Sequence, residues 1–323
     1  MSLRLRTFAL LMLVLGGSEA WAQGVSPFAE VLYWHASEET SSIWSSVISQ
    51  STSDPGNPTT TFAASDVQFG WNAGLRTGFL VEPEAWLWDF QLSWTHFRTA
   101  ADAAVPAGQH LVLPEFFSGF LSGDAYFFTS AALDWHLAYD TIDLEAGHQF
   151  AIGESLVLRP TFGLKIATIN QTIQAQWADP LLDLVANEHI DHDFLGVGPS
   201  FGLGATWALP QYPELRLVGS FSGAFLYGMW NVDDTFERAN PEVELLSFQT
   251  FKTSLHDSTL GTVMLRYFVG CEWTRRGKAD VTLHLGYELQ WWANQQRLTT
   301  FQQLPMHGDL TLQGGTCGIS VCF

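Results

Sequence analysis

The sequence predicts an all-β protein, a transmembrane antiparallel β-barrel with about ten strands, within a range of about eight to twelve. Three observations predict this class. Apolar and polar residues alternate over long stretches, Trp and Phe are abundant, and the connections between these stretches switch between short and long. The 323 residues include 14 Trp and 24 Phe, an aromatic content typical of the girdles at the two edges of a membrane barrel.

The clearest alternation lies in residues 67–79. One parity holds Val67, Phe69, Trp71, Ala73, Leu75, Thr77 and Phe79, and the other holds Gly, Gln, Asn and Arg76. Because successive side chains of a β-strand point to opposite faces, this strand has one apolar and one polar face. We expect lipid to contact the apolar face and the barrel interior to receive the polar face. The same pattern returns in residues 86–95, 195–207 and 281–291.

The alternating stretches define the expected strands and the connections between them. The strands are expected near residues 26–35, 67–80, 86–98, 130–152, 156–177, 193–209, 215–230, 258–273, 281–295 and 308–323. Short turns alternate with long loops near residues 36–66, 99–129, 178–192, 231–257 and 296–307. This asymmetry is typical of outer-membrane barrels, whose short turns face the periplasm. Several strands exceed the ~9–11 residues that cross a membrane, so we expect them to extend beyond the bilayer on the loop side.

One expected strand, residues 130–152, does not keep a single parity. Its apolar residues lie at odd positions up to Tyr139 and at even positions from Ile142 onward. A β-bulge near Asp140–Thr141 would produce this change. An additional hairpin, which would raise the count to about twelve strands, is the alternative.

The first 22 residues have the features of a secretory signal peptide. Arg4 and Arg6 precede an apolar stretch from Phe8 to Gly17, and the small residues Ala20 and Ala22 frame a cleavage site. We therefore expect residues 23–323 to form a single exported barrel domain.

The other end of the chain carries a second targeting feature. Phe323 follows apolar residues at every second position, which resembles the signal that the barrel-assembly machinery reads. The expected partners are therefore outer-membrane lipid and this machinery, with a homo-oligomer as a candidate. The net charge of −19 excludes nucleic acid as a partner, and no motif indicates a cofactor.

Parity assigns a set of charged residues to the barrel interior. They are Glu30, Arg76, Asp89, Asp134, His136, Asp143, Glu145, Arg159, Lys165, Arg216, Arg266, Glu272, His284 and Glu288. These side chains could line a lumen that selects solutes, or they could pair across a narrow interior and brace it. Because most of the net negative charge lies in the loops, an open lumen would have a weak cation preference.

The chain has three cysteines, Cys271, Cys317 and Cys322. Their expected strands put them beyond the reach of an intramolecular disulfide. Cys271 and Cys322 are expected near the short-turn rim, where they are candidates for an intermolecular disulfide. The alternative is that all three act as small apolar residues.

Two loop segments carry side chains that recur in metal or catalytic sites. Residues 189–193 place two His three positions apart between Asp residues, but a solvated acidic loop accounts for this segment better than a zinc site. His256 and Asp257 form a His–Asp pair near a strand end, and the omptin proteases, which are ten-stranded barrels, use an Asp–His couple at the extracellular rim for general acid–base catalysis. Because nothing around this pair supports a protease, we expect no metal and no enzymatic activity.

Several stretches resemble the Legionella-type major outer membrane proteins, a pore-forming family also found in chlamydia-like bacteria. The similar segments are Phe28–Trp34, Phe69–Gly78, Trp94–Phe97, Leu158–Pro160, Phe162–Leu164, Asn170–Gln171, Phe194–Pro199, Leu283–Glu288, Trp291–Trp292, Asn294–Gln295, Gly308–Leu310 and Gln313–Gly314. They fall on expected strands, in order, across nearly the whole mature chain.

The resemblance implies an outer-membrane barrel that acts as a general pore, and it supplies no catalytic residues. The residues themselves leave a second function open. A barrel closed by ion pairs would serve as a structural or adhesive protein of the envelope.

Overall fold

The computed structural model describes residues 24–39, 44–51, 59–83, 86–116, 128–181, 183–239, 248–299 and 305–322. The predicted signal peptide, residues 1–22, and Phe323 lie outside the described residues. In the described part of the chain, no helix is long and apolar enough to cross a membrane.

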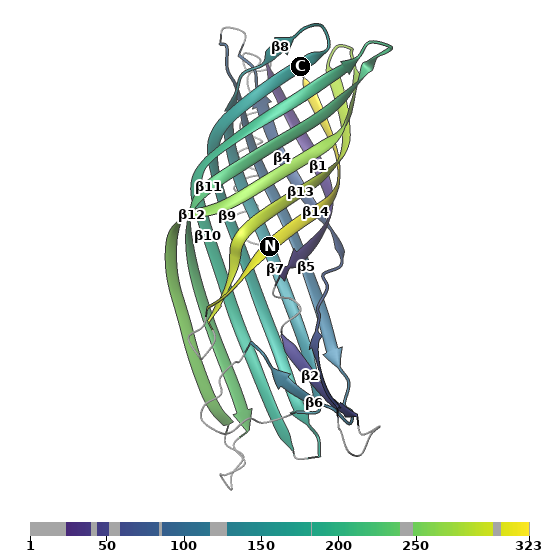
Figure 1. The fold of residues 1–323 in the computed structure, drawn as a ribbon. Helices are drawn as coiled ribbons and strands as arrows, with labels where there is room; N and C mark the ends of the chain where they lie inside the picture. Colours follow the sequence, from purple (N-terminus) through teal and green to yellow (C-terminus); the bar gives the residue numbers. More distant parts are fainter. Residues whose placement is uncertain are drawn as a thin grey trace.

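The chain folds into a closed antiparallel barrel of ten strands, as the sequence predicted (Figure 1). The barrel strands are β1 (Val25–Glu38), β4 (Trp71–Val81), β5 (Asp89–Val105), β7 (Ser130–Gly147), β9 (Leu156–Asp179), β10 (Leu184–Leu209), β11 (Tyr212–Ala239), β12 (Phe248–Arg275), β13 (Asp280–Thr299) and β14 (Pro305–Cys322). Each strand pairs with the next along this series, and β1 pairs with β14 to close the barrel.

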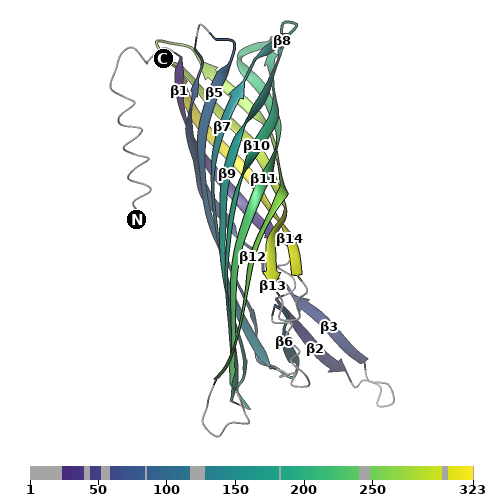
Figure 2. The same cartoon turned by 90° about the vertical axis from the view of Figure 1, so that its left-hand side faces the viewer.

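Four shorter strands complete the fold. β8 (Phe150–Ile152) pairs only with β9, just beyond the end of β7. β2 (Ser45–Ser51), β3 (Thr59–Ser65) and β6 (Leu111–Pro114) form a separate sheet in the order β3-β2-β6. This sheet lies at the long-loop end of the barrel, opposite β8 and the C-terminal end of β14 (Figures 1 and 2). The sequence did not predict this sheet, because its residues lie in two segments that were expected to be long loops.

Six neighbouring strands, β5, β7 and β9 to β12, continue well past the others at the long-loop end (Figure 1). β11 and β12 each have 28 residues, whereas β4 has 11. Much of the predicted loops 99–129, 178–192 and 231–257 is therefore strand, and the loop predictions were wrong there. We call the continuation of these six strands the extension.

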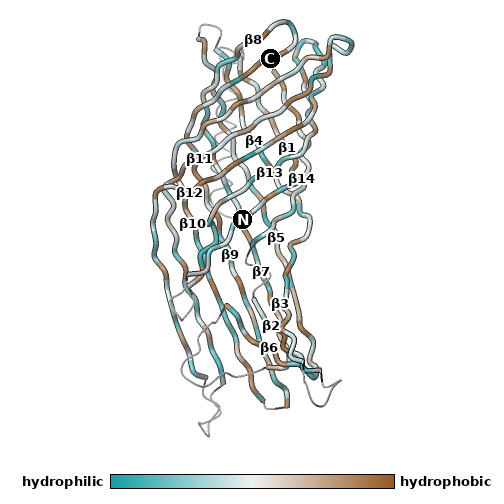
Figure 3. Tube along the Cα trace, in the orientation of Figure 1, coloured by the Kyte–Doolittle hydropathy of each residue, from teal (hydrophilic) through white to brown (hydrophobic). Residues whose placement is uncertain are grey.

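The outward face changes character where the extension begins. On β9 the outward residues are Phe162 and Leu164 near the short-turn end, but Gln174 and Gln176 farther along the same face. The inward face changes in the opposite sense, from Lys165 to buried aliphatic and aromatic residues. Because lipid favours apolar and water favours polar side chains, this reversal marks where the wall leaves the bilayer. Figure 3 shows brown and teal residues alternating along the strands at both ends, so alternation alone does not distinguish the two regions.

The same reversal accounts for the parity change in residues 130–152. β7 pairs with β5 and with β9 in continuous register, and no bulge occurs near Asp140–Thr141. The extra hairpin is also absent from this described segment. Odd-numbered residues point inward throughout β7, so Trp135 fills the interior of the extension, whereas Ile142 faces lipid. The bulge prediction was wrong because the strand is regular throughout. What changes along it is the outer environment, from lipid around the barrel to water around the extension.

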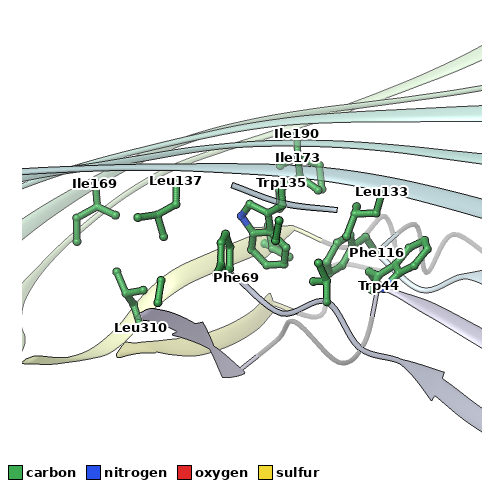
Figure 4. Packing of buried hydrophobic residues seen from close by; sticks show 14 of the residues in the cluster. Trp44, Phe69, Phe116, Leu133, Trp135, Leu137, Ile169, Ile173, Ile190 and Leu310 are labelled. Atoms are coloured by element: carbon green, nitrogen blue, oxygen red, sulfur yellow. The ribbon is translucent and has the colours of Figure 1, made fainter. Parts of the chain in front are cut away.

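Buried aromatic and aliphatic side chains fill the interior of the extension (Figure 4). Trp135 packs against Phe69 and Phe116, with ring centroids 5.5 Å and 6.1 Å away. Trp44, just before β2, is also completely buried. Burying each such side chain contributes roughly 1.5–3 kcal/mol. The small sheet and its flanking residues therefore help to cover the open side of the extension.

Two residues of the clearest alternating stretch have a different environment from the one expected. β4 begins only at Trp71, and the preceding Val67 and Phe69 are buried in the extension core. The lipid-facing assignment was wrong for these two residues, because they precede the strand and lie beyond the bilayer. From Trp71 to Phe79 the expected faces are observed.

Candidate functional site in the barrel interior

Arg76 lies at the centre of the barrel interior, on β4. Its guanidinium Nη1 lies 2.7 Å from Glu30 Oε2 on β1, and its Nη2 lies 2.7 Å from Glu288 Oε1 on β13. Its Nε donates a hydrogen bond to Thr95 Oγ1 on β5 at 3.0 Å. The Arg76 side chain therefore connects four strands of the barrel, β4, β1, β13 and β5.

Glu288 accepts further hydrogen bonds from β12 and from its own strand, β13. Arg266 Nη2, from β12, lies 3.0 Å from Glu288 Oε2. Gln290 Nε2 donates to Glu288 Oε1 at 2.7 Å, and Gln290 Oε1 accepts a hydrogen bond from Tyr139 at 2.6 Å. Glu30 also contacts His284 Nε2 at 3.3 Å. We call the carboxylate, guanidinium and imidazole side chains of this network the waist cluster: Glu30, Arg76, Arg266, His284 and Glu288.

The waist cluster leaves no accessible surface at its centre. The side chain of Arg76 is 5% exposed and that of Glu288 is 0% exposed. A side chain that borders a water-filled channel has surface that a water molecule can touch. No such channel therefore passes along Glu288 in this conformation.

A layer of rings lies next to the waist cluster on the side of the extension. It consists of Trp34, Phe97, Tyr139, Phe194 and Trp292, all buried and contributed by β1, β5, β7, β10 and β13. Trp34 lies 5.7 Å from Phe97 and 6.4 Å from Tyr139 between ring centroids, and Tyr139 lies 5.8 Å from Trp292. The Arg76 guanidinium carbon lies 5.6 Å from the centroid of Trp34, within the range of a cation–π contact. We call these five residues the aromatic layer.

The glycines of β4 let rings approach the wall. A Cβ on Gly78 would lie 2.8 Å from the Phe28 ring and 2.1 Å from the carbonyl oxygen of Leu92. A Cβ on Gly74 would lie 3.1 Å from the Phe97 ring. The two glycines therefore make room for rings that fill the interior.

The interior nearer the short-turn end also contains ion pairs. Arg159 pairs with Asp89, and Lys165 pairs with Asp143, each between different strands. The Arg159 side chain is 22% exposed, whereas those of Asp89 and Lys165 are 7% and 6% exposed. This end of the barrel interior therefore also carries charged side chains, held in ion pairs between strands.

The structure places most of the predicted interior residues on the inward face. These are Glu30, Arg76, Asp89, Asp143, Glu145, Arg159, Lys165, Arg216, Arg266, Glu272, His284 and Glu288. Asp134 and His136 are exposed on the outward face of β7, so their assignment to the lumen was wrong. They lie in the extension, where water replaces lipid and the apolar parity points inward.

The cysteines are free, and they do not share one face of the wall. Cys271 and Cys317 follow the lipid-facing parity, and both lie in register with Leu285 on the strand between them. Cys322 follows the inward parity at the rim, opposite Asp280. The intermolecular disulfide between Cys271 and Cys322 stays a prediction, although the two thiols point to opposite sides of the wall.

The two segments with metal-like or catalytic residue types are strands of the extension. On β10, His189 and Asp191 face outward, whereas His192 is buried inside and accepts a hydrogen bond from the Arg297 amide at 3.2 Å. On β12, His256 is exposed, and Asp257 pairs with Arg297. In the described part of the chain, no group of three or more His, Cys, Asp or Glu could hold a metal ion.

A buried carboxyl pair in the extension was not foreseen. Glu188 on β10 and Asp234 on β11 face inward at neighbouring positions, and their oxygens have no hydrogen-bond partner among the described residues. Burial, with the nearby Asp234, raises the pKa of Glu188 well above its usual value. Burial raises the pKa of Asp234 to about 7. The pair could be identified only by knowing which residues of β10 and β11 point into the extension. The sequence did not indicate this, because the inward face there carries the apolar residues.

The family model for the Legionella pneumophila major outer membrane protein precursor matches residues 19–323. The chain belongs to this family. The resemblance seen in the sequence is confirmed, and the family together with the barrel places the protein in the bacterial outer membrane. The chain has no significant match among curated proteins.

Solved structures similar to this family member are also outer-membrane barrels. The outer membrane protease OmpT from Escherichia coli shares 9% identity at a TM-score of 0.45, with 94% of this chain and 97% of that chain covered. A Pseudomonas aeruginosa FadL homologue shares 8% identity at a TM-score of 0.26, with 92% and 90% covered. A mutant of the TodX monoaromatic hydrocarbon channel shares 6% identity at a TM-score of 0.31, with 93% and 91% covered. Similarities this low transfer no activity to this chain.

Proposed function

We propose that the protein is an outer-membrane pore for small hydrophilic solutes or ions, which the waist cluster holds closed in the conformation described. The observation that carries this proposal is the difference between two adjacent cross-sections of the barrel. Five rings fill one of them, whereas ion-paired side chains fill the next. Burying ion pairs is no more stabilising than packing apolar residues of the same volume. A charged cross-section is therefore better explained by a polar route that opens when the pairs separate.

The charged interior toward the short-turn end supports the same function. It contains the Arg159–Asp89 and Lys165–Asp143 ion pairs, and Arg159 is partly exposed to water. Charged rings of this kind set ion preference in channels. Acidic and basic groups are nearly balanced there, whereas the outward face of the extension carries Asp191, Asp193 and Asp233. We therefore propose a weak cation preference, which a reversal potential favouring chloride across a salt gradient would contradict.

A closed barrel with a structural or adhesive role is the second candidate function. The aromatic layer favours it, because these rings are buried beside the waist cluster and must also move before solutes pass. In this function the barrel anchors the extension at the cell surface. Neither function requires a cofactor or a catalytic step, so we propose that the protein is not an enzyme.

Conductance in planar lipid bilayers tests the pore directly. The test variant is Arg76→Gln/Glu288→Gln, which removes the central ion pair and leaves the net charge of the waist cluster unchanged. The matched control is Arg98→Gln/Asp140→Asn, an ion pair of 3.3 Å on the outward face of β5 and β7. We expect brief stepwise openings in the unmodified protein, and at least a several-fold higher open probability in the test variant only. Silence of all three proteins, each shown to be folded, would establish the closed structural barrel instead.

A further inference from the structure

A groove of about 390 Å³ lies on the outward face of the wall at the start of the extension. It crosses β5, β7 and β9, which lie side by side in the wall (Figure 2). The outward side chains that line it are Arg98, Ala100, His136, Ala138, Asn170 and Thr172. Strand register places Ala138 between Arg98 and Asn170, and His136 between Ala100 and Thr172. The two alanines therefore form a floor between longer polar side chains.

The lipid-facing part of the same three strands ends next to this groove. Trp94, Ile142 and Ile166 face outward in register with one another. Two outward positions farther along, the aligned row contains Arg98 and Asn170. On all three strands the outward residues are apolar up to the first row and mostly polar beyond it. Since Trp is enriched where hydrocarbon meets the headgroups, the groove lies at the level of the lipid headgroups.

Arg98 supplies a positive charge at this level. Most basic side chains of the barrel point inward, among them Arg76 and Arg159, whereas the Arg98 side chain is 53% exposed on the outward face. Its Nη2 lies 3.3 Å from Asp140 Oδ2, and His96 Nδ1 lies 2.8 Å from the other oxygen of that carboxylate. Two basic side chains thus share one carboxylate. Because a guanidinium has five N–H donors, Arg98 keeps donors for a second anion.

We propose that this groove, which we call the headgroup groove, binds the phosphate of a lipid in the outer leaflet. Phosphate is an anion that membranes carry at this level, and Arg binds it through charge-assisted hydrogen bonds. His136, Asn170 and Thr172 offer further hydrogen-bond donors around the alanine floor. The acyl chains of the same lipid continue over the apolar row that contains Ile142. None of the lining residues belongs to the waist cluster or the aromatic layer, so the site is independent of whether the lumen opens.

Binding of a phosphorylated glycolipid tests the site. The probe is diphosphorylated lipid A, added to the full-length barrel in detergent micelles and measured by native mass spectrometry. We expect Arg98→Gln to weaken binding at least about tenfold. The control Lys252→Gln removes an exposed positive charge from β12 instead, and it should bind as the unmodified protein does. Equal affinities of the two variants, or weaker binding in Lys252→Gln alone, would overturn the proposal.

Two further probes separate the lipid from a soluble anion. Lipid A without its phosphates keeps the acyl chains, and we expect it to bind at least about tenfold more weakly. Inorganic phosphate lacks the chains, and at millimolar concentration it should not displace the lipid. Equal binding of the dephosphorylated lipid would show that no phosphate contacts Arg98. Displacement by inorganic phosphate would make the groove a site for soluble anions, which also contradicts the proposal.

Filling the headgroup groove tests its shape without a change of charge. Ala138→Leu places a larger side chain between Arg98 and Asn170. Ala132→Leu is the matched control, because Ala132 is exposed on the same face of β7 but outside the groove. We expect Ala138→Leu alone to weaken the binding of lipid A several-fold. Unchanged binding in Ala138→Leu would show that the headgroup lies elsewhere on the wall.

Discussion

Arg76 and Glu288 form a doubly hydrogen-bonded ion pair between strands β4 and β13, with Nη1 and Nη2 at 2.9 Å and 2.7 Å from the two carboxylate oxygens. The residues are 212 positions apart in the chain. Bidentate geometry and complete burial make this the best-defined contact of the waist cluster. It joins two strands that are not neighbours in the barrel sheet, since β14 and β1 lie between β13 and β4.

Replacing only the carboxylate should destabilise the barrel strongly. Glu288→Gln leaves Arg76 and Arg266 without a shared counter-charge inside the wall. Removing one partner of a buried ion pair costs roughly 3–5 kcal/mol of unfolding free energy. Urea unfolding in lipid vesicles, followed by tryptophan fluorescence, measures this cost. The control Glu154→Gln lies in an exposed turn and should stay within about 0.5 kcal/mol. Equal effects of the two substitutions would contradict the role given to Glu288.

The position of the bilayer on the wall can be tested with two substitutions on one face of β9. Leu164→Arg places a charge on the lipid-facing segment and should cost up to about 2–4 kcal/mol. Gln174→Arg lies on the same face of the extension and should cost almost nothing, because water already surrounds it. Folding free energies in vesicles give both values. A cost at Gln174 as large as that at Leu164 would mean that the bilayer covers the extension.

The aromatic core of the extension should be essential for its order. Trp135 is completely buried, and its Nε1 donates to Gln171 Oε1 at 2.8 Å. We expect Trp135→Ala to cost about 3–5 kcal/mol and to expose the extension to limited proteolysis. Trp207→Ala is the control, because Trp207 lies exposed on the outward face of β10. Similar proteolysis of both variants would argue against a packed interior.

The buried carboxyl pair predicts that the extension loses stability as the pH rises. The pKa of the Asp234 carboxyl rises from 3.8 in the unfolded chain to about 7 in the folded protein, because folding buries it. Between these values the folded protein binds more protons, so the unfolding free energy falls with rising pH. Glu188 acts in the same direction, because burial raises its pKa as well.

His192 acts in the opposite direction at lower pH. Burial, together with the nearby Arg297, lowers the pKa of His192 from 6.5 to about 4. Between these values the unfolded chain binds the additional proton, so this contribution rises with pH. The opposing contributions partly cancel below pH 6.5. The clearest loss is therefore expected near neutral pH.

Hydrogen exchange of β10 and β11 amides between pH 5 and 8 measures this dependence, after correction for intrinsic exchange rates. We expect the opening free energy to fall by roughly 1 kcal/mol per pH unit near pH 7. Asp234→Asn should reduce this slope, whereas Asp233→Asn, on the outward face, should keep it. An unchanged slope in Asp234→Asn would rule out the pair as its source.

The strands within the bilayer could be predicted because two fixed environments, lipid outside and charged groups inside, impose a strict period of two. Trp71 to Phe79 illustrates this, since its expected faces agree with those observed. Beyond the bilayer the period of two persists, but the apolar side chains point inward and the polar side chains point outward. Asp134 and His136 therefore received the wrong face, and β10 from Leu184 to Asp193 was expected to be mostly loop.

The sequence by itself determined the class of the fold, the strands of the membrane-spanning wall and the family, because these depend on local alternation and on motifs carried by single strands. The tertiary structure alone decided which charged groups meet. Closure between β1 and β14, together with the strand register, brings Glu30, Arg76 and Glu288 to one level of the interior. The tertiary structure also shows that the aromatic layer closes the interior next to these charged groups. Contacts between residues that lie far apart along the chain leave no periodic signal within any one strand, so only the closed barrel reveals them.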